Sequence, residues 1–200
     1  MNTEHKAKTK SRSYMLALFA VFFGPLFFAM WLFYVPNSWL NASTQNHGTL
    51  IQPAKPLDAF SISNASGDTW DKSQFMGKWT LLYVGDEECD LYCEASLFKM
   101  RQVRLTLGRD SQRVERKYIG IDKQKNKNTI EVILSNYPRM QVRWFEQEKI
   151  QQSLTNFNLE KNHIYLIDPL GNLMMRYTID ATSKGMKKDL KRLLKVSKIG

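Results

Sequence analysis

Two cysteines in the middle of the chain, Cys89 and Cys93, are the residues best suited to chemistry. On a helix, side chains four residues apart are neighbours, with Cβ atoms about 5–6 Å apart. Two thiolates at that spacing can bind one soft metal ion, and two ligands come nearer to the low coordination of Cu(I) than to a tetrahedral zinc site. The same pair can form a disulfide if the Cα atoms lie within about 4.4–6.8 Å. The spacing therefore predicts a metal site, a redox-active pair or a structural disulfide.

Acidic residues surround this pair. No basic residue occurs among positions 79–98, and five carboxylates flank the cysteines: Asp86, Glu87, Glu88, Asp90 and Glu94. A nucleophilic cysteine needs an electropositive setting, which here only the N-terminus of a helix would supply. The same negative charges favour a bound cation. Metal binding is therefore favoured over thiol catalysis, and a structural disulfide is the simplest alternative.

His163 is the candidate for a third metal ligand, as a neutral imidazole. It opens an expected strand, and strand ends in an α/β fold can approach the carboxyl end of a neighbouring strand. The alternative is a packing or surface histidine beside Asn162. The other two histidines, His5 and His47, lie outside the expected folded domain, so neither is a convincing ligand.

The elements that must position these residues follow an α/β pattern. The apolar run 79–84 is typical of a strand buried on both faces, and helical spacing predicts a helix over 91–107, directly after Cys89. The other expected elements are a hairpin of strands at 57–62 and 69–70, strands at 114–121, 163–167 and 173–178, and helices at 128–137 and 183–196. Residues 120–129 resemble a polar loop. This order predicts an α/β sandwich with parallel and antiparallel strands, in which ligands meet the ends of strands.

An apolar segment near the N-terminus, residues 15–35, is about 21 residues long, which suffices to cross the hydrocarbon core as one helix. Four basic residues precede it within 1–12 and none follows before Lys55, so the N-terminus is expected in the cytoplasm. A cleaved signal peptide is disfavoured because its apolar core is shorter, about 7–15 residues. The sequence predicts a single-pass anchor in a bacterial inner membrane, with the folded domain in the periplasm.

The basic charge of the chain lies at its two ends. The net charge is +10, of which residues 1–12 contribute +3 and residues 182–198 contribute +6, so the body of the protein is nearly neutral. A nucleic-acid partner is not expected, since that would need a basic face across the folded domain. The C-terminal helix is amphipathic, with lysines on its outer side. Those lysines form either a solvated face or a contact with anionic lipid or an acidic partner.

Several motifs together resemble a known family. They are the run from Phe60 through Gly67, Gly77-Lys78-Trp79, Tyr83-Val84-Gly85, Cys89-x3-Cys93 and Tyr165-Leu-Ile-Asp-Pro-x-Gly171. The chain resembles the Sco/SenC family of cytochrome c oxidase assembly proteins over about residues 57–195. The resemblance implies a thioredoxin-like fold over 57–200 with an N-terminal β-hairpin, preceded by a basic N-terminus (1–14), one transmembrane helix (15–35) and a linker (36–56).

The resemblance also implies a copper site, Cu(I) or Cu(II), made by Cys89, Cys93 and a distant histidine. It implies delivery of copper to the binuclear copper centre of the oxidase, or reduction of the cysteines of that centre, with an oxidase subunit or another assembly factor as partner. The family histidine usually stands about five residues before the Tyr-Leu-Ile segment, where this chain has Glu160, so His163 corresponds only with a shift.

Two other classes of function stay open, a thiol-disulfide oxidoreductase and a non-catalytic scaffold. A thioredoxin-type disulfide oxidoreductase would normally have Cys-x-x-Cys and a proline before the third strand, and residues 155–163 contain no proline. A peroxiredoxin is disfavoured as well, because Asp86 stands where a threonine would precede the reactive cysteine. A non-catalytic scaffold with a structural disulfide is the remaining alternative. A metallochaperone or assembly factor is therefore favoured over an enzyme.

Overall fold

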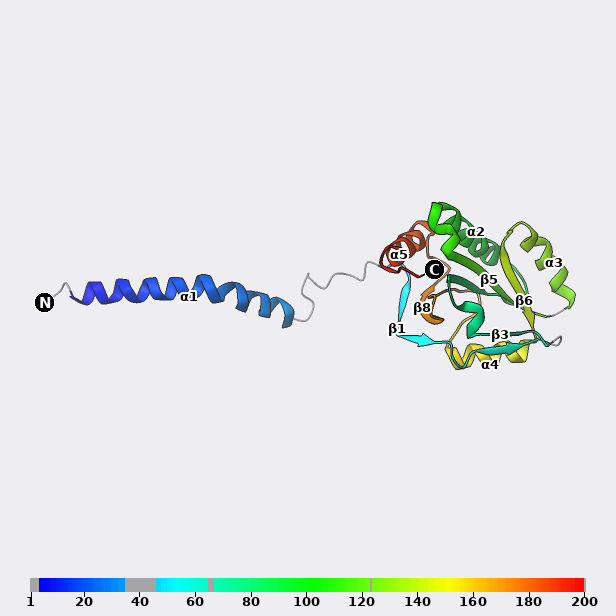
Figure 1. Ribbon diagram of the computed structural model, residues 1–200, viewed down its shortest axis with the longest axis horizontal. Coiled ribbons are helices and arrows are strands. Elements are labelled where there is room, and N and C mark those ends of the chain that lie inside the picture. The colour runs from blue at the N-terminus through cyan, green and yellow to red at the C-terminus, as the bar shows by residue number, and fades with distance from the viewer. Residues whose placement is uncertain (1–3, 35–45, 65–66, 123, 200) are drawn as a thin grey trace. The chain divides into compact units, whose positions relative to one another are not determined.

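The computed structural model describes residues 4–34, 46–64, 67–122 and 124–199. The chain divides into two compact units, residues 1–45 and residues 46–200. Figure 1 shows one long helix in the first unit and a mixed α/β domain in the second.

The first unit contains helix α1 (Glu4–Tyr34), which includes Pro25. Its segment Tyr14–Trp31 has a mean hydropathy of 1.9, and none of it is buried, so it is long and apolar enough to cross a membrane. A membrane helix tolerates a proline because neighbouring groups satisfy the freed backbone carbonyl. This helix agrees with the predicted apolar segment 15–35, although residue 35 lies outside the described residues.

The second unit is built on a six-stranded sheet with the order β1-β8-β7-β4-β5-β6. Its strands are β1 (Thr49–Pro56), β4 (Trp79–Val84), β5 (Val114–Ile121), β6 (Met140–Phe145), β7 (Ile164–Ile167) and β8 (Asn172–Tyr177). Strands β4, β5 and β6 are parallel, whereas β7 pairs antiparallel with both β4 and β8. Strand β4 is buried along its whole length because it is central and both faces of the sheet are covered.

Helices cover one face of the sheet, and a helix with a hairpin covers the other (Figure 1). Buried side chains of α2 (Leu91–Thr106), α3 (Gln124–Ser135) and α5 (Ser183–Val196) pack with Tyr83 and Ile164. Buried side chains of α4 (Gln147–Phe157) and of the hairpin β2 (Ser61–Ser63) and β3 (Thr69–Asp71) pack with Leu82 and Tyr165. Two short 3-10 helices, η1 (Lys72–Phe75) and η2 (Gly108–Arg113), complete the domain. The predicted α/β fold with an N-terminal hairpin is confirmed.

The folded unit begins earlier than the linker predicted at 36–56 implies. Residues 36–45 lie outside the described residues, but 49–56 form β1, which pairs with β8 at the edge of the sheet. The buried carboxylate of Asp189 accepts hydrogen bonds from the backbone N–H groups of His47 and Gly48, at 2.9 and 3.0 Å. An edge strand tolerates prolines, so the composition that suggested a tether is also compatible with this strand.

Three further parts of the domain differ from the sequence analysis. Strand β6 and helix α4 lie in 139–162, where no element was predicted. Helix α3 begins at Gln124, within the segment 120–129 that was interpreted as a loop. In α4 the buried residues Ile150, Leu154 and Phe157 recur at helical spacing, so its apolar face was detectable in the sequence.

Candidate redox and copper site

The cysteines follow the carboxyl end of β4: Cys89 lies on the loop that begins with Gly85, and Cys93 lies in the helix that follows it. The backbone N–H of Gly85 donates to the carbonyl oxygen of Ile119 at 2.8 Å, which fixes the start of this loop against β5. A Cβ atom at position 85 would lie 2.2 Å from the phenol oxygen of Tyr118. Glycine is therefore required here because the loop passes directly over a buried tyrosine.

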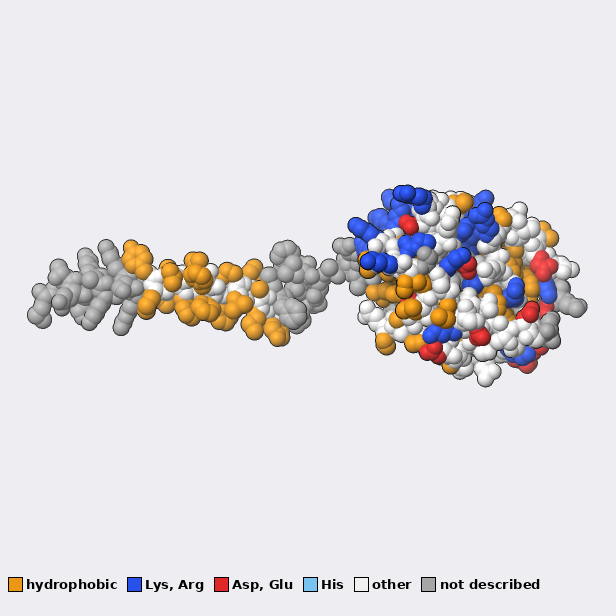
Figure 2. Space-filling view, in the orientation of Figure 1, with side chains coloured by type: hydrophobic (Ala, Val, Ile, Leu, Met, Phe, Trp, Pro, Cys, Tyr) orange, Lys and Arg blue, Asp and Glu red, His pale blue; other side chains and the backbone are white. Residues whose placement is uncertain are grey.

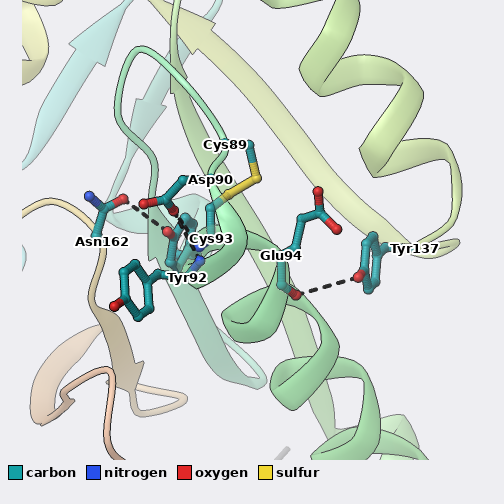
Figure 3. The surroundings of a disulfide bond; sticks show 8 residues. Cys89, Asp90, Tyr92, Cys93, Glu94, Tyr137 and Asn162 are labelled. Atoms are coloured by element: carbon teal, nitrogen blue, oxygen red, sulfur yellow. Dashed lines mark hydrogen bonds between the residues drawn. A yellow bond between two sulfur atoms is a disulfide. The ribbon is translucent and has the colours of Figure 1, made fainter.

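Cys89 and Cys93 are joined by a disulfide, with their Cα atoms 5.1 Å apart (Figure 3). Asp90 between them is the N-cap of α2, and its carboxylate accepts hydrogen bonds from the backbone N–H groups of Tyr92 (3.1 Å) and Cys93 (2.9 Å). Cys93 lies in the first turn of α2 and is only 1% exposed, whereas Cys89 is half-buried. Cys89 is therefore the sulfur that a partner can approach.

Two stacked tyrosines lie on the same face of the sheet as the disulfide. The ring centroids of Tyr83 and Tyr118 are 5.7 Å apart, and the Tyr83 hydroxyl donates to the side-chain oxygen of Asn162 at 3.0 Å. Burial raises the pKa of both phenols; for Tyr83 the neighbouring Tyr118 and the carboxylates of Asp90 and Asp86 raise it further. Both tyrosines are therefore neutral at physiological pH and present hydroxyl groups rather than phenolates.

The acidic loop is partly neutralised by a lysine from a distant segment. The Lys161 ammonium lies 2.8 Å from a carboxylate oxygen of Asp86, and that same carboxylate accepts the backbone N–H of Glu87 at 2.8 Å. Glu88, Asp90 and Glu94 are exposed. The field at the disulfide thus stays negative, which disfavours a thiolate and favours a cation.

His163 lies on the opposite face of the sheet from the cysteines. Its neighbour Ile164 packs with Cys93, and because successive side chains alternate, His163 points to the other face together with Tyr165. Its contacts agree: Nδ1 lies 2.9 Å from the carbonyl oxygen of Lys161, Nε2 lies 3.6 Å from Glu160, and its ring centroid lies 6.4 Å from that of Tyr165. The structure brings the two cysteines together and does not bring His163 to them.

Comparison with known proteins identifies the fold. A sequence model of the family described as transmembrane-like, thioredoxin-like, C-terminal domain matches residues 79–197, more than half of the chain. The chain belongs to this family. The matched segment begins with β4 and includes the cysteine pair, His163 and all of α5. Among curated proteins no significant sequence match is found.

This chain shares its fold with solved Sco proteins. Apo Sco1 from Thermus thermophilus superposes with a TM-score of 0.63 at 19% identity, covering 74% of this chain and 97% of that protein. ScoI from Bradyrhizobium japonicum, solved with copper bound, gives a TM-score of 0.54 at 23% identity, with 68% and 97% covered. The thioredoxin domain of a thiol-disulfide oxidoreductase from Bacteroides vulgatus gives 0.52 at 14% identity, with 68% and 92% covered. The predicted resemblance to Sco/SenC proteins is confirmed at the level of the fold.

The donor atoms of this thioredoxin-like domain fit a soft metal ion only in part. Among the described residues, no group of three or more His, Cys, Asp or Glu side chains is arranged to hold a metal ion. Sulfurs joined in a disulfide do not act as thiolate ligands, but reduction would release two thiols, one just before α2 and one in its first turn. The buried hydroxyl of Tyr118, which has no hydrogen-bond partner among the described residues, is a hard oxygen donor and does not suit Cu(I). The described side chains therefore supply two soft ligands.

Sequence reasoning found the cysteines and missed most of their surroundings. Asn162, Lys161, Tyr83 and Tyr118 all belong to the site, and Tyr137 lies over the first turn of α2, its hydroxyl 3.5 Å from the carbonyl oxygen of Glu94 (Figure 3). Tyr83 sits in an apolar run and appears in the sequence only as a core residue. Asn162 and Lys161 come from a loop whose position depends on how β7 enters the sheet, and no local pattern encodes it.

Proposed function

We propose that the chain is a membrane-anchored assembly factor for cytochrome c oxidase. In this proposal residues 15–35 span the bacterial inner membrane, residues 1–14 remain in the cytoplasm and the thioredoxin-like domain works in the periplasm. The apolar segment of α1 and the basic residues before it support the anchor and its orientation. The shared fold with Sco proteins supports the role in assembly.

The chemistry we propose is thiol-disulfide exchange with the cysteines of the oxidase copper centre, at a rate that the surrounding carboxylates lower because they disfavour the thiolate. The single observation that carries it is the Cys89–Cys93 disulfide, with one accessible and one buried sulfur. In the dithiol form, the Cys89 thiolate attacks a disulfide sulfur of the partner and the first partner thiolate leaves. The Cys93 thiolate then attacks the Cys89 sulfur, which releases the second partner thiolate and re-forms the Cys89–Cys93 disulfide. Two electrons pass to the partner, and a separate dithiol reductant must restore the pair.

Cu(I) transport is the second candidate function. Reduction of the pair creates two soft sulfur donors within a ring of carboxylates, and that field attracts a cation. Cu(I) would then be the cargo of the dithiol form, held by Cys89 and Cys93. The position of His163 on the other face of the sheet means that a third ligand would have to come from a rearrangement or from the partner protein.

The test of the exchange proposal uses the full chain in a nonionic detergent. The reduced Cys93→Ser variant is mixed with an oxidase copper-centre domain whose two cysteines are oxidised, and the mixed disulfide is detected by mass spectrometry. We expect a trapped adduct with Cys93→Ser and none with Cys89→Ser, because only Cys89 is accessible. Equal trapping by both variants, or no exchange by the reduced wild-type protein, would contradict the proposal.

A parallel titration with Cu(I) tests the second candidate function, copper transport. Anaerobic reduced protein is titrated with Cu(I) against a competing chelator, with the Cys89→Ser/Cys93→Ser double variant as control and His163→Ala as the test of the third ligand. One tightly held copper that disappears in the double variant supports transport. An unchanged affinity in His163→Ala would exclude this histidine as a ligand, and no copper at all would leave thiol exchange or a scaffold role.

A further inference from the structure

An arginine is buried in the domain without a charged partner. Arg116, on β5, is only 3% exposed. One of its terminal nitrogens, Nη2, donates to the carbonyl oxygen of Pro138, but Nε and Nη1 are buried with no hydrogen-bond partner among the described residues. A buried guanidinium normally has its donors satisfied, because leaving a buried polar group unpaired costs about 1–3 kcal/mol, and more for a charged group. Two empty donor positions on a buried cation therefore need an explanation.

Three more arginines surround Arg116 in one cavity of about 450 Å³, which we call the arginine pocket. Its lining residues are Arg101, Arg104 and Leu105 of α2, Arg116 of β5, and Pro138 and Arg139 from the turn between α3 and β6. Arg139 holds the left-handed backbone conformation, with φ of 65°, which non-glycine residues adopt rarely and often at functional sites.

No carboxylate compensates this charge among the described residues. Glu115, next to Arg116 in the sequence, is paired elsewhere: its carboxylate lies 3.0 Å from the Lys78 ammonium and 3.4 Å from that of Lys117. Burial, together with the charges of Arg104, Arg101 and Arg139, lowers the pKa of Arg116 to about 10. The four guanidinium groups repel one another, and an anion between them would remove that cost.

We propose that the arginine pocket binds a small anion bearing a phosphate group. Arginine guanidinium groups donate readily to phosphate oxygens, and Arg116 has two donor atoms, Nε and Nη1, with no partner among the described residues. A phosphate monoester carries up to two negative charges at pH 7, which suits a site with four cations better than a single carboxylate does. The cavity volume falls in the range of small-molecule sites, about 300–1,000 Å³, and Leu105 and Pro138 supply apolar walls for an organic substituent.

This pocket is separate from the disulfide. Arg101 and Arg104 lie eight and eleven residues beyond Cys93 on α2, which places them about 12–17 Å along the helix from it. Figure 2 shows that Lys and Arg side chains are concentrated on the side of the domain that carries α2 and α5. The surrounding positive charge would draw an anion towards this face, and binding there does not depend on the proposed function of the cysteines.

The experiment measures phosphate binding to the full chain in nonionic detergent by isothermal titration calorimetry at constant ionic strength. The probes are inorganic phosphate, phenyl phosphate and, for comparison, succinate. The variants are Arg139→Gln, an exposed residue of the pocket, and Arg116→Met, with Arg109→Gln on η2 as an exposed arginine outside it. We expect one saturable site for both phosphates, at least tenfold weaker binding in Arg139→Gln, none in Arg116→Met, and no change in Arg109→Gln.

Melting temperatures and lipid nanodiscs test the role of Arg116 and the source of the phosphate group. Arg116→Met should melt at the same or a higher temperature than wild type in phosphate-free buffer, because it removes a buried unpaired cation; a lower melting temperature with retained phosphate binding would overturn the proposal. Phosphatidylglycerol nanodiscs in buffer without free phosphate test whether the bound phosphate group belongs to a lipid headgroup. A lipid source is supported if the nanodiscs raise the melting temperature of the wild type but not that of Arg139→Gln. Equal binding by all variants, or succinate binding as tight as phosphate, would refute the phosphate site.

Discussion

Asp90 both caps α2 and places a negative charge between the two cysteines, and two substitutions separate these roles. Asp90→Asn keeps an acceptor for the backbone N–H groups of Tyr92 and Cys93, now 3.1 and 2.9 Å from the carboxylate, but removes the charge. Asp90→Ala removes both. Loss of an N-cap costs about 0.5–2 kcal/mol, whereas exchange between good capping residues costs little. We therefore expect Asp90→Ala to lower the free energy of unfolding by about 1 kcal/mol, and Asp90→Asn to leave it nearly unchanged.

Loss of the Asp90 carboxylate should lower the pKa of the Cys89 thiol in both variants. Two unit charges about 6 Å apart interact by about 1.4 kcal/mol at an effective dielectric constant of about 40, which is a tenfold change in the thiolate population. Because only the thiolate is alkylated, reduced Cys89 in a Cys93→Ser background should react with iodoacetamide up to about tenfold faster in Asp90→Asn and Asp90→Ala. The exposed Glu131→Gln on α3 is the control for loss of a distant carboxylate. If Asp90→Asn and Asp90→Ala destabilised the protein equally, the capping role of Asp90 would be refuted. An unchanged alkylation rate would refute the influence of the acidic loop on the Cys89 thiol.

Three other predictions concern stability, measured by urea unfolding of the full chain in detergent. The Cys89–Cys93 disulfide closes a loop of five residues, so the Cys89→Ser/Cys93→Ser variant should lose about 2 kcal/mol relative to the oxidised protein, and a loss above about 5 kcal/mol would indicate a structural role. Tyr118→Phe removes a buried hydroxyl that has no partner, so the variant should be as stable as wild type or more stable by about 1 kcal/mol; a clear loss of stability would reveal a partner. Burial would raise the pKa of Glu115, but the hydrogen bond from Lys78 and the charge of Lys117 outweigh it and lower the pKa. This carboxylate therefore stabilises the fold above its ordinary pKa of 4.5 and loses that contribution as the pH falls through the lowered value. Glu115→Gln should narrow the difference in stability between pH 6 and pH 3, and an unchanged difference would contradict the pairing.

The sequence was most informative where burial is complete. Residues 79–84 and 114–121 form strands whose bounds match the prediction, and nearly all of their side chains are buried. The first of them is an uninterrupted apolar run, the pattern of a strand covered on both faces. Helix α5 also begins and ends as predicted, since its buried residues Met186, Leu190 and Leu194 recur at helical spacing beneath exposed lysines. In such elements the local pattern and the tertiary environment agree.

Edge elements were missed because half of their surface remains polar. Strand β6 alternates between exposed and half-buried side chains up to the buried Phe145, and an alternation over only six residues is a weak signal. Strand β1 carries prolines and few apolar residues, and it is held by pairing with β8 and by Asp189, more than 130 positions away in the chain. Contacts between residues so far apart in the sequence leave no local pattern. A polar, proline-containing segment can therefore be either a tether or an edge strand.

The cysteine pair and the histidine differ in what fixes their geometry. Cys89 stands directly before the N-cap of α2 and Cys93 lies in its first turn, so the short spacing in sequence already predicted that the two sulfurs could meet. The side of the sheet on which His163 lies depends instead on the register of β7, and moving a strand by one residue exchanges its two faces. Asn162, not His163, bonds to Tyr83 on the side of the cysteines, whereas His163 packs by Tyr165. In the observed register the histidine therefore lies on the other face of the sheet from the cysteine pair. The pair itself consists of a half-buried Cys89 and a buried Cys93, an asymmetry that the proposed thiol-disulfide exchange would use.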